Sequence, residues 1–533
     1  MQVLYTFFQS GLMPFYKRPL FIALLLTLAV FAVYLQTLTD YGPTWDEFMH
    51  RQTGQTYINY FRTGEMMELG NWDDWSWFPP VAVTFGTSLI NFEPLKAIYP
   101  LDVDRFHLAA VIFASVCIGM VFLIAHRLTD DLGISVFAAG LLASYPQFVA
   151  HAHMNVRDIG LTIFYSLTIY ILLIAVSSRR PVLMAAVAGL AGGITTDTKQ
   201  NGAFLLFIGL IWFTLHLRRL GMRKWLLMSV MFGVFFTGAF FAFWPYLWED
   251  TTRRLGLVWH FLTTPEIIAG STIYFDRVYT SMKDIPVYYP WVMLFIFTPP
   301  LMALAVITGL FKSVSSILRD KKEFLIFLWL VVPLSRFLFP FSSISYDQIR
   351  HFFEVVPSLA VLAALGLWWL SHSLPRAVRL PLIGFAGAFL LAYNIGLSAA
   401  YHPFGTAYFN RFAGPPAYVA QAFDVEFWGN VYRQAVPRIN ALDSAGKYTY
   451  YTGAMGTHLW KENGFLGTLV DDQHLEYDYV VFMNKQALIR NIPYLQWLVA
   501  DKDPVFTISR GGVPVFYMFP AHRQEFLSTL PPR

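Results

Sequence analysis

The sequence has few charged residues and almost no cysteine. Asp, Glu, Lys and Arg make up only 14% of its 533 residues, whereas soluble globular domains carry about 25%, so an ordinary soluble fold is excluded. The single cysteine, Cys117, rules out a disulfide within the chain and, inside an apolar run, is expected to be a core residue. A formal net charge of +4 is too small to indicate a nucleic-acid partner.

Apolar residues are what the sequence has in excess. They make up 56% of the chain and gather in runs of about 20 residues, long enough to cross a bilayer core of about 30 Å. We therefore predict an α-helical polytopic membrane protein with about 11 transmembrane helices. The predicted spans cover residues 19–39, 106–126, 132–149, 159–177, 182–195, 202–217, 225–245, 287–310, 323–340, 352–371 and 380–400. The first is expected to be a retained span rather than a cleaved signal, because its apolar part is too long and no small-x-small site follows it.

Basic residues set the predicted orientation. Lys and Arg mark every second boundary between spans, at residues 17–18, 127, 179–180, 218–224, 312–322 and 376–379. Because Lys and Arg are enriched on the cytoplasmic side of membrane helices, the pattern predicts a cytoplasmic N-terminus and a C-terminus outside. It also predicts a large first outer loop over residues 40–104.

Residues 401–533 differ from the rest of the chain, because no apolar run in them could span a membrane. Their β-rich stretches lie at residues 448–452, 479–482, 505–508 and 513–519, and Gly511-Gly512 between the last two is a hairpin signal. We predict a transmembrane domain over residues 1–400, followed by a small extracytoplasmic α/β domain over residues 401–533.

The stretch from Thr44 to His50 puts two adjacent carboxylates directly after the first span. Asp46 and Glu47 cannot share a helix face, so one can point into a cavity while the other bonds the local backbone or a cation. A carboxylate beside a membrane-bounded cavity loses hydration, which is expected to raise its pKa and make it a better base. The alternative is that Asp46 caps a helix running from Glu47 to Tyr60; capping and catalysis could also coexist.

Polar residues also open the second and fourth spans. Arg105 and Arg157 could each hold a phosphate through the guanidinium fork, or could be interfacial residues that reach for water. Asp158 could join such a site or simply cap its helix. His151 and His153 are candidate ligands of a divalent metal near Asp158, but without a further ligand at helical spacing an ordinary hydrogen-bonding role is favoured.

Further cations lie where apolar runs are interrupted. Lys199 sits in a break between two short runs, which is costly unless the ammonium faces a cavity or an anion. Arg350 and His351 open the tenth span and could bind an anionic headgroup; alternatively, Arg350 pairs with Asp347 in its own loop. Taken together, these loops supply carboxylates and cations that suit a reaction on a phosphate-linked substrate in the outer leaflet.

The order of these motifs resembles that of the GT-C membrane glycosyltransferases, specifically the family-39 group of protein O-mannosyltransferases and lipid A aminoarabinose transferases. The resemblance covers most of residues 20–435. The matching motifs are Asp46-Glu47, Phe78-Pro79-Pro80, Arg105, Ala143–Pro146 with Asn155–Asp158, Gly192-Gly193 with Lys199, Asp347–His351 with Pro357, and Tyr408–Asn410 through Phe427–Gly429. Where the aminoarabinose transferases have Glu-Lys before Pro-Pro, this chain has Trp77-Phe78, which argues against that activity.

The resemblance implies an inverting transferase that uses a polyprenyl-phosphate-linked sugar as donor, in a bacterial inner membrane. By the resemblance, Asp46 is the general base that deprotonates an acceptor hydroxyl on a protein, lipid or polysaccharide, and Glu47 orients a neighbour or the acceptor. The leaving phosphate needs cations, for which Arg105, Lys199 and Arg350 are candidates. Whether a divalent metal acts as cofactor is left open by the sequence.

Two other functions compete with this interpretation. A transporter or flippase of a lipid-linked saccharide would suit the break near Asp197–Lys199 and the kink expected at Pro299-Pro300. It predicts charges at the membrane midplane, whereas the charges here cluster at the outer ends of the spans, which favours the enzyme. A non-catalytic partner in envelope-polymer assembly is the second alternative.

Overall fold

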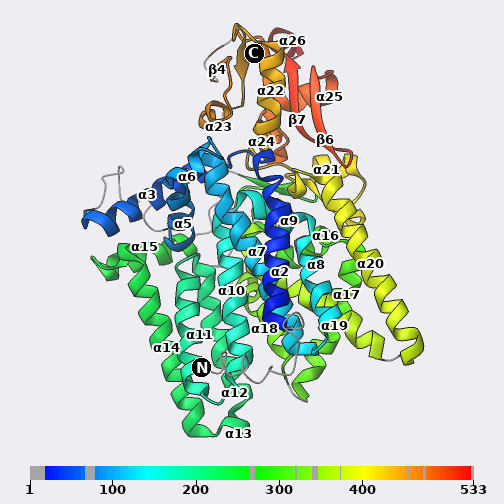
Figure 1. Cartoon of the computed structure of the whole chain (residues 1–533). Coiled ribbons are helices and arrows are strands. Elements are labelled where there is room, and N and C mark those ends of the chain that lie inside the picture. The colour runs from blue at the N-terminus through cyan, green and yellow to red at the C-terminus, as the bar shows by residue number, and fades with distance from the viewer. Residues whose placement is uncertain are drawn as a thin grey trace.

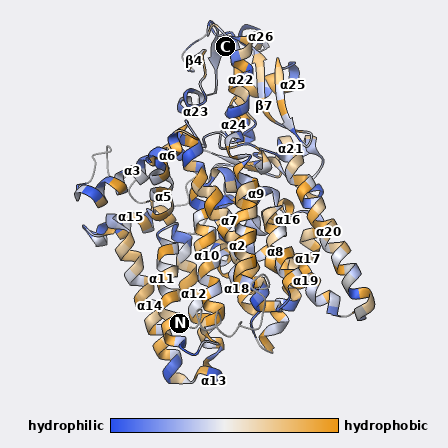
Figure 2. Ribbon diagram, viewed as in Figure 1, coloured by the Kyte–Doolittle hydropathy of each residue, from blue (hydrophilic) through white to orange (hydrophobic). Residues whose placement is uncertain are grey.

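The computed structural model describes residues 18–65, 78–263, 271–318, 321–338, 346–372, 374–453, 456–471, 474 and 476–529. Long helices run side by side in one body, and the C-terminal strands gather in a cap at one end of it (Figure 1). Orange, apolar residues dominate the helical body, while the cap is mixed (Figure 2). The predicted helical class is therefore confirmed, and the predictions on Lys17 and Trp77 lie outside the described residues.

Six helices of the described chain are long and apolar enough to cross a membrane. They are α7 (Asp102–Thr129), α10 (Val156–Ala175), α14 (Met222–Phe243), α17 (Pro300–Ser315) with its extension to Leu318, η9 (Arg350–Val355) with α19 (Val356–His372), and α20 (Arg376–Tyr401). A seventh span results if α8 (Leu132–Ala143) and α9 (Pro146–Met154), bent by 64°, are taken as one. Pro146 explains the bend, because it has no N–H to continue the helix.

The other predicted spans are helical but shorter. They are α2 (Pro19–Leu35), α11 (Pro181–Thr196), α12 (Phe204–Leu215) and α18 (Phe324–Leu334). The predicted span over residues 287–310 consists of α16 (Tyr289–Phe297) and most of α17. The predicted kink at Pro299-Pro300 is a complete break between α16 and α17. The count of eleven spans therefore stays a prediction.

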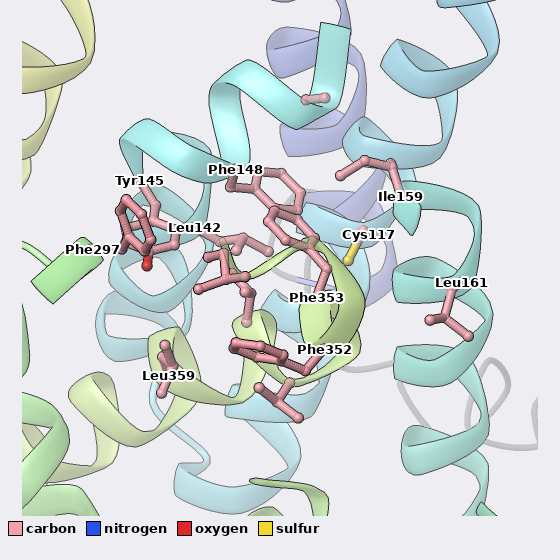
Figure 3. Close-up of a cluster of buried hydrophobic side chains, with 14 of the residues drawn as sticks. Cys117, Leu142, Tyr145, Phe148, Ile159, Leu161, Phe297, Phe352, Phe353 and Leu359 are labelled. Atoms are coloured by element: carbon pink, nitrogen blue, oxygen red, sulfur yellow. The ribbon is translucent and has the colours of Figure 1, made fainter. Parts of the chain in front are cut away.

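The centre of the body is formed by α7, α10 and α19, whose apolar stretches are mostly buried. Cys117 of α7 packs there near Phe148, Phe352 and Phe353, as expected for a core cysteine (Figure 3). By contrast, α14 and α20 expose most of their apolar surface, as expected for helices that face lipid.

Small residues allow the helices to approach closely. A Cβ atom added at Gly309 of α17 would collide with the Leu362 carbonyl oxygen of α19, and one at Gly193 would collide with the Phe236 carbonyl oxygen of α14. Small residues at such crossings are typical of membrane helix packing, where close van der Waals contact replaces the hydrophobic effect.

The cap contains a five-stranded mixed sheet with the order β4-β3-β5-β7-β6. Its strands are β3 (Thr449–Tyr451), β4 (Thr468–Val470), β5 (Tyr479–Met483), β6 (Phe506–Arg510) and β7 (Val513–Pro520), with α22 (Tyr432–Leu442), α23 (Thr457–Glu462), α24 (Gln486–Asn491), α25 (Pro493–Asp501) and α26 (Arg523–Thr529) beside them. The predicted hairpin is present, because β6 and β7 pair antiparallel across Gly511-Gly512. Both glycines have positive φ, +57° and +80°, which a two-residue hairpin turn requires. The predicted division at residue 400 and the side of the membrane stay predictions.

The predicted first outer loop contains α3 (Glu47–Thr63), α5 (Val81–Ile90) and α6 (Glu93–Lys96). A left-handed Gly64 ends α3 with a hydrogen bond to the Tyr60 carbonyl. Because α5 packs against both α3 and α7, the start of α3 is held over the ends of the long helices.

Candidate functional site

Asp46 stands at the N-terminus of α3 but makes no side-chain capping bond. Its Oδ2 instead accepts a 2.6 Å hydrogen bond from Nη1 of Arg350, whose Nη2 donates to Asp347 Oδ2, also at 2.6 Å. One guanidinium thus bridges two carboxylates from distant parts of the chain. The anticipated pairing of Arg350 with Asp347 is present, but Arg350 reaches Asp46 as well.

The expectation of a raised Asp46 pKa is wrong. Burial does favour the protonated form, but the Arg350 guanidinium, helped by His50 and Arg157, more than offsets it and holds the pKa of Asp46 below its ordinary value. His50 lies one turn further along α3, and burial together with the Arg157 charge lowers its pKa to about 4. At neutral pH, Asp46 is therefore an ionised acceptor and His50 is a neutral imidazole.

Glu47 is turned away from this arrangement and is almost completely buried. Its Oε2 lies 2.8 Å from Nε2 of His107 on α7 and accepts a 3.1 Å bond from the Thr44 amide, while Arg51 Nε lies 3.7 Å from its Oε1. These contacts lock the start of α3 onto α7. The adjacent carboxylates of Asp46 and Glu47 thus contact different partners, as expected because neighbouring residues face different sides of a helix.

Lys199 and Asp158 form the second part of the site. Lys199 Nζ lies 2.6 Å from Asp158 Oδ1 and 3.4 Å from the Arg350 carbonyl oxygen, so the break after α11 is brought against the start of α10 and η9. Asn155 both caps α10 by accepting from the Asp158 amide and donates to Asp158 Oδ2 at 2.8 Å. Burial lowers the pKa of Lys199, although the Asp158 carboxylate opposes this effect.

Arg157 is the cation of the site that no carboxylate neutralises directly. Within the described residues it forms no ion pair; its guanidinium stacks 4.4 Å from the centre of the Phe78 ring, and Nη2 donates to Gln200 Oε1 at 3.1 Å. Its buried Nε has no hydrogen-bond partner. Phe78 belongs to the Pro-Pro motif of the first loop, so that motif supports the guanidinium through its ring.

Arg105 lies apart from the other predicted cations. Its guanidinium donates to the carbonyl oxygens of Ile90, Tyr99 and Pro100 and pairs with Asp102. These bonds fasten the loop between α5 and α7. The structure therefore does not bring Arg105 into contact with Asp46, Arg157, Lys199 or Arg350.

His351 is buried beside the site, with its ring 4.6 Å from that of Tyr346. Its carbonyl oxygen accepts from Asn201, which also donates to Glu354 at 2.9 Å. The backbone of His351 thus helps to hold the turn after Lys199, while its Nε2 has no hydrogen-bond partner in the part of the chain that the structure describes.

Sequence reasoning missed the residue that covers Arg350. The Trp428 ring lies 4.9 Å from the guanidinium, and its carbonyl oxygen accepts a 2.8 Å bond from the amide of Trp45, next to Asp46. The Trp428 amide is in turn held by Glu426 Oε1 at 3.1 Å, and burial raises the pKa of Glu426 to about 7. The Phe427–Gly429 motif signalled this contact, but its role needed the tertiary structure.

No group of three His, Cys, Asp or Glu side chains in the described part of the chain is placed to hold a metal ion. The two histidines of the predicted pair turn to different neighbours. His151 Nδ1 meets the Asn155 amide at 2.7 Å, whereas His153 lies against the carbonyl oxygens of Val149 and Tyr34 at 2.7 and 3.0 Å.

Comparison with known proteins finds a family match for part of the chain. Residues 103–248 match the family model described as dolichyl-phosphate-mannose-protein mannosyltransferase. No curated protein sequence matches the chain.

Two solved structures are similar over most of the chain. The crystal structure of ArnT from Cupriavidus metallidurans bound to undecaprenyl phosphate has a TM-score of 0.47 at 14% identity, covering 93% of this chain and 97% of that one. The archaeal oligosaccharyltransferase AglB from Archaeoglobus fulgidus, in complex with an inhibitory peptide and a dolichol-phosphate, has a TM-score of 0.47 at 12% identity, covering 95% and 75%. The predicted resemblance is confirmed by the family match: residues 103–248 of the chain match the dolichyl-phosphate-mannose-protein mannosyltransferase family of membrane glycosyltransferases.

Proposed function

We propose that the protein is an inverting glycosyltransferase, which moves a sugar from a polyprenyl-phosphate-linked donor to a hydroxyl group of an acceptor. The family match over residues 103–248 supports glycosyl transfer. The main support for the proposal is that Arg157 forms no ion pair among the described residues, although it lies near Asp46 and Asp158. Its buried Nε also has no hydrogen-bond partner among these residues. A buried cation with no direct ion pair is costly, although the Asp158 and Asp46 carboxylates act on it from further away, and a phosphate group would supply a direct partner.

Asp46 serves in this mechanism as the base. It is ionised at neutral pH and can take the proton of the acceptor hydroxyl as the oxygen attacks the anomeric carbon. The new C–O bond forms on the face opposite the phosphate, the bond from the anomeric carbon to the phosphate oxygen breaks, and the configuration inverts. Arg350 holds Asp46 in place through its 2.6 Å bond.

The leaving polyprenyl phosphate carries the negative charge that develops in this reaction. Arg157 and Lys199 are the cations that receive it, while Asp158 positions Lys199 through their 2.6 Å contact. Arg105, Glu47 and His351 act through packing and backbone contacts, by holding the first loop, the start of α3 and the turn after Lys199.

The proposed setting is the outer face of a bacterial inner membrane. The basic clusters support a cytoplasmic N-terminus, which puts Asp46, Lys199 and Arg350 at the outer ends of their helices and residues 401–533 outside as a separate domain. Charges at helix ends, rather than at the midplane, favour an enzyme over a transporter.

The test is sugar release from a panel of radiolabelled polyprenyl-phosphate sugars by the purified protein, with and without a chelator. We expect turnover by the wild type and a loss of about 1000-fold in Asp46→Asn, because the base is removed while the side-chain shape is kept. Asp503→Asn, an exposed aspartate in the cap, is the matched control and should keep full activity. Folded wild-type protein that turns over no donor, or Asp46→Asn protein as active as wild type, would refute the proposal.

A further inference from the structure

A cleft of about 650 Å³ lies against α3, next to the start of α7. On α3 it is lined by Phe48, Arg51, Gln52 and Gln55, whose spacing puts them on one helix face. At about 100° per residue, Asp46 lies on nearly the opposite side of the helix from Phe48. The cleft is therefore separate from the Asp46 arrangement, although α3 contributes to both; α3, α5 and α6 lie together at one edge of the body (Figure 1).

The charges that line the cleft do not suit an anion. Arg51 is the one cation among the described residues that line the cleft, and its Nη2 donates to both oxygens of Glu462 in α23 at 2.6 Å. Asp102 is the other charged lining residue, and it pairs with Arg105. The lining thus contains the carboxylates of Glu462 and Asp102 and the Arg51 guanidinium, which is already paired. No free positive charge is left there to bind a phosphate. The cleft is thus chemically unlike the surroundings of Arg157.

Neutral hydrogen-bonding groups lie beside exposed apolar ones in the cleft. The Gln52 side-chain amide makes no hydrogen bond within the described chain, and Gln55 Oε1 accepts from Asn91 at 2.9 Å. A primary amide offers two N–H donors and one acceptor oxygen, which can serve neighbouring hydroxyl groups together. The Phe48 ring, 44% exposed, provides a flat apolar surface next to them. Hydroxyl groups and an apolar C–H face occur together in a pyranose ring.

We propose that this cleft binds a neutral saccharide unit of the acceptor. The assignment to the acceptor rests on the proposed glycosyl transfer. An α-helix with its side chains is about 10 Å across, so the unit in the cleft is not the one that reacts at Asp46 but one further along a longer saccharide. Such remote binding positions the reacting hydroxyl without taking part in the chemistry.

Saturation-transfer NMR on the full-length protein in nanodiscs, free of sugar-headed detergents, tests the binding without any turnover. The probes are the methyl α-pyranosides of glucose, mannose and galactose, and the disaccharide maltose. We expect saturation transfer to at least one probe, and about fivefold weaker binding in Gln52→Ala and in Phe48→Leu, since each removes one contact. Inorganic phosphate should not displace the bound sugar.

Controls separate this inference from the proposed reaction. Gln496→Ala, an exposed amide of α25, should bind as the wild type does. Asp46→Asn should lose donor turnover and keep sugar binding. No transfer to any probe, equal binding by the wild type and Gln52→Ala, or displacement by phosphate would overturn the saccharide site. Retained binding by a wild type that turns over no donor would overturn the proposed reaction and leave the site standing.

Discussion

Asp46 and Glu47 are neighbours in sequence but belong to two differently built clusters. The Glu47 cluster (Glu47, Arg51, His107 and Glu462) joins α3 to α7 and α23, and each of its charges faces a group of opposite charge or an imidazole. The Asp46 cluster (Asp46, Arg157, Asp158, Lys199, Asp347 and Arg350) also contains ion pairs, but Arg157 forms none of them within the described chain.

From this difference we infer an anchoring role for the Glu47 cluster and a binding role for the Asp46 cluster. A buried charge that is fully paired can only be lost at a cost in stability, whereas one left without a counter-ion is available to a ligand. Substitutions in the Glu47 cluster should therefore change folding, and substitutions in the Asp46 cluster should change activity.

The largest loss of stability is expected for Glu47→Gln. The substitution leaves His107 buried without its carboxylate, so we expect a loss of about 3 kcal/mol in the free energy of unfolding. Thermal unfolding in detergent measures it as a fall in Tm. Glu93→Gln, which breaks the exposed pair with Lys96, is the control and should change stability by less than about 1 kcal/mol. Equal effects of the two substitutions would remove the distinction between the clusters.

Arg157→Gln should lower donor turnover about 100-fold, because a cation that receives the leaving phosphate is lost. Its Tm should stay near that of the wild type, since no ion pair is broken. Arg105→Gln gives the opposite pattern: its bonds to the loop carbonyls are lost, so Tm falls while activity per folded molecule is kept. A large activity loss in Arg105→Gln with an unchanged Tm would place Arg105 in the site instead.

Asp197 is a buried carboxylate that belongs to neither the Glu47 cluster nor the Asp46 cluster, so it shows what burial alone does to a carboxylate. Neither of its oxygens has a hydrogen-bond partner among the described residues, and burial raises its pKa from 3.8 to about 10. Since the folded-state pKa is raised, the protonated form stabilises the protein below about pH 4, and that contribution is lost as the pH rises toward 10. Between pH 5 and 8, the free energy of unfolding of Asp197→Asn should rise relative to that of the wild type, by up to about 1.4 kcal/mol per pH unit. The difference between the two Tm values should therefore increase with pH. Parallel Tm curves would show that Asp197 is ionised.

The smallest effect is expected for Trp428→Leu. Loss of the ring over Arg350 should lower turnover about tenfold, in keeping with a desolvated cation–π contact. Because Trp428 acts through Arg350, restoring an aromatic ring in Trp428→Phe should recover most of the activity. A Leu variant as active as the Phe variant would show that only the volume of the side chain matters.

Sequence alone determined the helical class, the positions of the apolar helices and the C-terminal hairpin. Each follows from local chemistry: long apolar runs need a membrane, and Gly511-Gly512 adopts the positive φ of a tight turn. Local signals also predicted the candidate site, because Asp46, Lys199 and Arg350 all lie where apolar runs end. The short strands β1 (Thr272–Tyr274), β2 (Arg277–Tyr279) and β4 were missed, since a run of three residues shows little alternation. The strand β3 is equally short but lies in the longer β-rich stretch at residues 448–452.

Only the tertiary structure decided which charges meet. Arg105 and Arg157 look alike in sequence, because each lies near the start of an apolar helix. In the structure, however, Arg105 donates hydrogen bonds to backbone carbonyl oxygens, whereas Arg157 stacks on the Phe78 ring. The pKa of Asp46 was predicted in the wrong direction, because the partner that lowers it, Arg350, lies 304 residues away. Electrostatic interactions depend on distance in space, so pairing between remote segments cannot be read from local composition.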